Sequence, residues 1–257
     1  MTIRDIALLA GTLFFTNLSA QVGVGGKVGA NYAVGSQKIQ PDPKNPPTNP
    51  KGLGMQFGAF LSIPFSDMVG IRPELGFSFR KMNTESSVNE SYNNAQVVFE
   101  TPQGQQQGTF TGNQETRTQV DQRLSYFQVV APITLTPSEG LRVMLGPSFN
   151  FLMGGKQNTD VTITTKGTAT VGGQSQNIDE EDFQSSKKKG SGAIKDFRKA
   201  DIGALAGIGY TLPVGLDLDL RYTRSLSTTY DETQGKSRYR IWTNLIEFSV
   251  GWQFGGK

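Results

Sequence analysis

Charged residues alternate with apolar ones in the segment LDLDLRY (216–222), which places Asp217, Asp219 and Arg221 on one face of an extended strand. The chain has no histidine and no cysteine, which removes the commonest general base, the Ser-His triads, thiol nucleophiles and Cys-ligated zinc. An enzyme would have to work with carboxylates, Lys or Tyr alone. We therefore expect no enzymatic activity, no cofactor and no metal site, and the charges need another explanation.

The overall charge and the first twenty residues narrow the class of protein. The net charge is only +3, and no basic stripe is interleaved with aromatic residues, which argues against nucleic acid as a partner. Residues 1–20 combine Arg4, a short apolar run and a small residue, Ala20, in the pattern of a signal peptide that is removed on export. The apolar run is too short to cross a bilayer as a helix.

Eight segments of the remaining chain alternate between apolar and polar residues with a period of two. Short turns (64–67, 136–140 and 213–215) alternate with long polar stretches, which we read as loops at 35–52, 83–118, 155–198 and 227–240. Within the third of these, residues 161–171 predict a hairpin that turns at Lys166-Gly167. Residues 21–257 thus predict a single all-β domain: an eight-stranded antiparallel up-and-down transmembrane barrel with long extracellular loops and short periplasmic turns.

The two faces of these strands allow two interpretations. In a soluble lipocalin-like barrel the apolar face points inward, whereas in a membrane barrel it meets lipid and the polar face fills the lumen. Many glycines fall on the polar face, as a narrow lumen requires. We therefore favour the membrane barrel, and we predict a paired charge network that plugs its lumen, since buried charges persist only when paired. Its predicted members are Lys27, Arg72, Glu74, Arg142, Asp217, Asp219, Arg221 and Glu247.

Aromatic residues on the apolar face support the same interpretation. They lie near the ends of the predicted strands, where interfacial girdles of membrane barrels occur. The predicted girdle consists of Tyr32, Tyr210, Tyr222, Trp242, Trp252 and Phe254.

Several of these segments resemble the PorT-like outer-membrane β-barrel proteins of the Bacteroidetes. The similar pieces include VGGKVGANYAVG (24–35), GAFLSIPFSDMVGIRPELGFSFRK (58–81) and LRVMLGPSFNFLMGG (141–155). The resemblance covers the strands but not the loops. The resemblance implies a barrel that the barrel assembly machinery inserts into the outer membrane. The protein after which the family is named is linked to type IX secretion and gliding. Such barrels usually end on an aromatic residue, whereas here three residues follow Phe254.

Three functional hypotheses follow. The first is a non-enzymatic barrel that acts through its long loops, either by binding surface partners or as an accessory of protein secretion or envelope assembly. The second is a small outer-membrane channel, which needs a continuous wet path past the charges. The third is a soluble lipid-binding barrel. The expected partners are outer-membrane lipid, the assembly machinery and proteins met by the loops.

Overall fold

The computed structural model describes residues 22–101, 104–189, 194 and 196–255, so the expected signal peptide (1–20) lies outside the described residues. Every named element of this part of the chain is a β-strand, and no helix in it is long and apolar enough to cross a membrane. The strands are β1 (Gly23–Gln40), β2 (Lys51–Pro64), β3 (Val69–Ile71), β4 (Glu74–Thr101), β5 (Gly104–Val130), β6 (Ile133–Ser138), β7 (Leu141–Val171), β8 (Gln174–Lys189), β9 (Ala200–Thr211), β10 (Leu216–Ser225), β11 (Tyr230–Gln234) and β12 (Ser237–Phe254).

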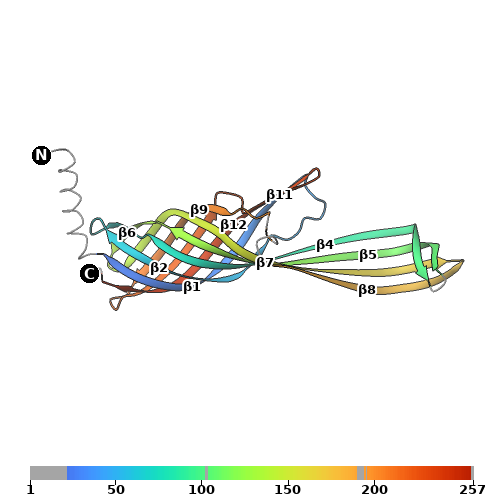
Figure 1. Ribbon diagram of the computed structural model, residues 1–257, viewed down its shortest axis with the longest axis horizontal. Coiled ribbons are helices and arrows are strands. Elements are labelled where there is room, and N and C mark those ends of the chain that lie inside the picture. The colour runs from blue at the N-terminus through green and yellow to red at the C-terminus, as the bar shows by residue number, and fades with distance from the viewer. Residues whose placement is uncertain (1–21, 102–103, 190–193, 195, 256–257) are drawn as a thin grey trace.

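Eight of these strands close a ring. Antiparallel pairing runs from β1 through β12, β10, β9, β7, β5, β4 and β2 back to β1 (Figure 1). The sequence predicted eight strands, but the described chain forms twelve. Two of the extra strands, β3 and β6, are short pieces set off by Arg72-Pro73 and Ala131-Pro132, because proline has no N–H for the ladder. The amide of Arg72 still bonds the carbonyl of Pro132 at 2.9 Å across the break.

Much of the sequence that we expected to form loops is instead β-strand. The polar stretches 83–118 and 155–198, which the sequence predicted to be loops, belong largely to β4, β5, β7 and β8. Beyond the ring these four strands form an antiparallel sheet, which we call the arm (Figure 1). Likewise, most of 227–240 forms the β11–β12 hairpin. Within 35–52, strand β1 reaches Gln40 and β2 begins at Lys51. Most side chains on both faces of the arm are polar and exposed or half-buried, so its strands lack the apolar alternation by which strands are recognised.

The predicted hairpin at Lys166-Gly167 is also wrong. Residues 161–171 run straight within β7, and the chain turns instead at Gly172 and Gly173, which have φ values of 59° and 83°. Two consecutive residues with positive φ suit a tight two-residue hairpin turn. The predicted short turns do occur, between β2 and β3, β6 and β7, and β9 and β10.

The wall of the ring has an apolar outside and a polar inside. Along β10 the side chains of Leu220 and Tyr222 are exposed, whereas Asp217, Asp219 and Arg221 are buried. The same alternation holds around the ring, where the exposed large side chains include Val28, Phe57, Leu75, Leu145, Ile208 and Phe248. An apolar outside around a charged inside is the arrangement of a membrane barrel. The soluble lipid-binding barrel, which needs the reverse, is therefore overturned.

Candidate functional site

The inward-facing charges of the ring come from six strands, β1, β4, β7, β9, β10 and β12, and from the break between β3 and β4. Antiparallel register sets their heights: Arg142 of β7 lies opposite Gly209 of β9, and Gly209 lies opposite Asp219 of β10. A β-carbon at Gly209 would lie 2.2 Å from an oxygen of Asp219. Only glycine at this position leaves room for the ion pair to cross β9.

Arg142 holds the two aspartates of LDLDLRY together. Its Nη1 donates to Asp217 Oδ1 at 3.0 Å, and its Nη2 donates to Asp219 Oδ1 at 2.9 Å. The hydroxyl of Thr211 donates to Asp217 at 2.6 Å and accepts a hydrogen bond from Arg142. The paired carboxylates are thus bridged by a guanidinium and buried, which leaves them no access to a substrate.

Glu74 forms a second centre next to the first. Both of its oxygens accept hydrogen bonds of 2.6 Å from Arg221, in the two-pronged geometry that arginine and carboxylate favour. Lys27 also bonds Glu74, and Arg72 lies 3.3 Å from it. The side chains of Arg221 and Glu74 are 1% and 2% exposed.

Cross-links join the two centres into one network. Arg221 donates to Asp219 at 2.8 Å, and Arg72 lies 2.9 Å from Asp217 and 3.7 Å from Asp219. The guanidinium of Arg72 also stacks 3.5 Å from the centre of the Phe60 ring. We call the connected set the charge plug: Lys27, Arg72, Glu74, Arg142, Asp217, Asp219 and Arg221.

Glu247, the eighth residue predicted for the network, is placed differently. It is buried opposite Arg221 in the register, but it accepts its hydrogen bond from the hydroxyl of Thr223 at 3.2 Å. No ion pair within 4.0 Å joins it to the described part of the chain. It nevertheless balances the plug, because the eight residues comprise four cations and four carboxylates.

A second polar cluster lies on the arm side of the charge plug. Arg80 donates to Asn150 at 2.8 Å, lies 3.7 Å from Asp201, and stacks 4.2 Å from the centre of the Tyr126 ring. Ser225 also bonds Asp201. The strand pattern places Arg80 and Asp201 on the polar face, but sequence reasoning did not pair them, because their partners come from distant strands.

Sequence reasoning also missed an apolar cap over this cluster. Ile194 and Phe197, from the segment between β8 and β9, pack among buried Met82, Leu124 and Leu245. The ring of Phe197 also packs edge-on against the ring of Tyr230, with 5.0 Å between the ring centroids. The apolar residues Ile194 and Phe197 within an otherwise polar segment were the sequence signal by which this cap could have been predicted. Three layers therefore fill the lumen: charge plug, Arg80 cluster and apolar cap.

The six predicted girdle residues all lie on the wall rather than in the lumen. Tyr210, Trp252 and Phe254 lie close to the short-turn end of their strands and are exposed. Tyr32, Tyr222 and Trp242 lie further toward the arm, where Tyr222 is exposed and the other two are half-buried. Whether these two groups sit at membrane interfaces stays a prediction.

Within the described residues, no group of three or more acidic side chains is arranged to hold a metal ion. The carboxylates of the lumen already accept hydrogen bonds from arginine, lysine, serine or threonine. Their arrangement can close the lumen and hold neighbouring strands in register.

Several solved structures are similar to this chain at low identity. Neisserial surface protein A is 11% identical over 89% of this chain and 97% of its own, with a TM-score of 0.37. OprG from Pseudomonas aeruginosa is 10% identical over 92% and 97%, with a TM-score of 0.35. Ail, the attachment invasion locus protein of Yersinia pestis, is 13% identical over 91% and 99%, with a TM-score of 0.31.

No curated protein matches the chain. A family model described as the outer membrane protein beta-barrel domain matches residues 16–231. This match covers the charge plug, the arm and most of the ring. The protein is therefore an outer-membrane protein that belongs to the outer membrane protein beta-barrel domain family.

Proposed function

We propose that this protein is a closed, non-enzymatic, eight-stranded barrel that anchors the arm outside the cell, where the arm binds surface partners. The observation that carries the proposal is the filled lumen, which leaves the arm as the part of the molecule able to meet other proteins. The described chain begins and ends at the barrel end opposite the arm, where Val24 pairs with Phe254 (Figure 1). In our proposal this end faces the periplasm, and Phe254 serves the barrel assembly machinery.

The arm offers two kinds of binding surface. Its faces carry mostly Thr, Gln, Asn and Ser, which can exchange hydrogen bonds with a partner. Its two edges are the outer sides of β4 and β8: beyond Glu85, β4 pairs with β5 alone among the described strands, and β8 pairs with β7 alone. An unpaired strand edge can accept an additional strand from a partner.

For the biological role we propose a PorT-like accessory of protein secretion or envelope assembly. The support is the sequence resemblance of the strands together with an arm suited to contacting other proteins. A small channel is the competing function. The filled lumen argues against it, because water and ions would need a path past the charge plug, the Arg80 cluster and the apolar cap.

The test is a deletion strain complemented with two forms of the gene. One form encodes the full chain. The other encodes a barrel with a shortened arm, in which Asn-Gly turns join Ser87 to Arg117 and Val161 to Gln184, since each of these pairs already lies opposite in the register. Heat-modifiable gel mobility verifies that the shortened form folds.

The secreted and surface proteomes of the parent, the deletion strain and the two complemented strains are then compared. We expect the deletion to lose a class of secreted or surface proteins, and we expect the full chain, but not the shortened form, to restore it. Full restoration by the shortened form would show that the arm is dispensable and would overturn the proposal. Unchanged proteomes in the deletion strain would overturn the secretion role.

A further inference from the structure

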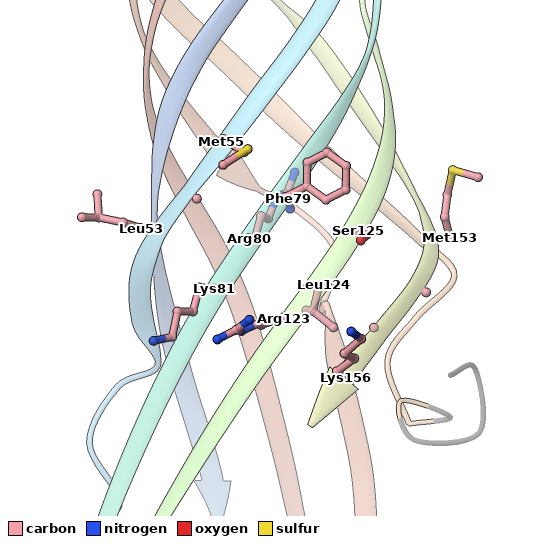
Figure 2. Close-up of a pocket in the computed structure, with 13 residues that line it drawn as sticks. Leu53, Met55, Phe79, Arg80, Lys81, Arg123, Leu124, Ser125, Met153 and Lys156 are labelled. Atoms are coloured by element: carbon pink, nitrogen blue, oxygen red, sulfur yellow. The ribbon is translucent and has the colours of Figure 1, made fainter. Parts of the chain in front are cut away.

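A groove of about 710 Å³ lies on the outer wall, where the ring passes into the arm (Figure 2). Its apolar floor includes Leu53, Met55, Phe79 and Met153, and all four side chains are exposed. The groove opens on the outer wall rather than into the lumen, and the function proposed above does not use it.

Three basic residues cross the arm side of this groove in one row. Lys81 of β4 pairs with Arg123 of β5, which pairs with Lys156 of β7. Directly paired residues of antiparallel strands share a face of the sheet. Figure 2 shows the three side chains next to one another on adjacent strands, beyond Met55, Phe79 and Met153. We call them the basic row.

The basic row has no counter-charge in the described part of the chain. None of the three residues forms an ion pair there, and Asp121, in the next outward-facing row, is paired with none of them. Like charges placed directly opposite each other destabilise a sheet. The row is therefore unfavourable unless an anion lies against it.

A β-bulge places the third cation in the row. Tyr126 pairs with Leu152 but Ser125 pairs with Gly154, so Met153 is an extra residue in β7. Without the bulge, Gln157 would face outward and Lys156 would point into the lumen. With it, Lys156 joins the outer face, while Gln157 turns inward and accepts a hydrogen bond from Gln122 at 3.3 Å. Bulges commonly re-aim a side chain in this way.

The position of the row identifies the anion. On its ring side the wall is apolar, and on its arm side the next outward row is Asn83, Asp121 and Asn158. The row thus lies where the apolar wall ends, at the level of lipid headgroups. We propose that the groove and the basic row bind a phosphate-bearing anionic lipid of the arm-side leaflet, with its phosphates on the basic row and an acyl chain in the groove.

Two variants separate the charge contribution from the acyl contribution. The triple variant Lys81→Gln/Arg123→Gln/Lys156→Gln removes the charges. Its matched control, Lys38→Gln/Lys44→Gln/Lys236→Gln, removes the same net charge from exposed positions away from the groove. Gly154→Trp fills the groove, because a β-carbon at Gly154 meets no atom within 4 Å.

The measurement is native mass spectrometry of the full mature chain in detergent, with bisphosphorylated lipid A, phosphatidylcholine and inorganic phosphate as probes. Each basic residue near an anionic lipid contributes about a factor of five to binding, so the triple variant should bind lipid A roughly 100-fold more weakly. The control variant should bind like the wild type. Gly154→Trp should bind lipid A at least about tenfold more weakly, because burying even a few methylene groups accounts for such a factor.

Three results would overturn the proposal. Equal retention of lipid A by the wild type and the triple variant would remove the role of the basic row. Phosphatidylcholine bound as tightly as lipid A would show a merely apolar groove. Inorganic phosphate that competes at the same concentration as lipid A, with no effect of Gly154→Trp, would show a simple anion site without a lipid chain.

Discussion

Arg221→Leu tests the charge plug most severely among single substitutions. Arg221 donates two hydrogen bonds of 2.6 Å to Glu74 and one of 2.8 Å to Asp219, and its side chain is 1% exposed. Removing it leaves Glu74 with Lys27 and Arg72, and leaves the lumen with one uncompensated negative charge. Breaking one partner of a buried ion pair typically costs about 3–5 kcal/mol, and we expect that loss in the free energy of unfolding.

Urea unfolding of the barrel in lipid vesicles, followed by heat-modifiable gel mobility, measures this loss. Arg117→Leu is the matched control, because Arg117 belongs to the arm and its side chain is 67% exposed. Arg117 lies 3.3 Å from Glu115, and an ion pair at the surface contributes about 0–1 kcal/mol. The double variant Arg221→Leu/Glu74→Leu should recover only part of the loss, because it restores the balance of cations and carboxylates in the lumen but leaves Lys27 without its ion pair. An unchanged urea midpoint for folded Arg221→Leu would refute the network.

Three further predictions concern other parts of the molecule. Gly209→Leu should prevent stable folding, because its side chain would occupy the space of the Arg142–Asp219 pair, and the yield of heat-modifiable barrel measures this. Arg238 and Arg198 lower the pKa of Asp231 to about 2 by hydrogen bonding, so its stabilising effect is complete above the unfolded pKa of about 4 and is lost as the pH falls toward 2. The advantage of the wild type over Asp231→Asn in urea midpoint should therefore be present at pH 5 and shrink as the pH falls through about 2; a constant difference would contradict the assignment. Gly172→Val/Gly173→Val should loosen the tip of the arm, where both φ values are positive, and faster amide exchange in β7 and β8 with unchanged exchange in β10 is the expected result.

The alternation of apolar and polar residues along the strands was sufficient to predict the ring. In LDLDLRY the order of apolar and charged residues assigns each side chain to the wall or the lumen, and the structure places Asp217, Asp219 and Arg221 inside. Charge balance and the narrow lumen of a small barrel then indicate pairing, but not which carboxylate meets which arginine. Those partners depend on the register between strands that are far apart in the sequence.

The arm could not be read from alternation. Its strands are solvated on both faces, so residues such as Thr162, Thr164 and Gln114 carry no apolar period, and polar composition was mistaken for a loop. The turn was misplaced because Lys166-Gly167 and Gly172-Gly173 are both plausible turn sequences, and only pairing with β8 selects the second. The bulge at Met153 is likewise a property of the register, with no local signal in the sequence.

The central claim is that the lumen is closed by the charge plug, the Arg80 cluster and the apolar cap. Single-channel recording of the purified barrel domain, residues 21–257, in planar bilayers tests it most directly, with the shortened-arm form as a control for any contribution of the arm. We predict no steady open state for either form. A large, steady conductance that persists in the shortened-arm form would contradict the closed lumen and would favour the channel.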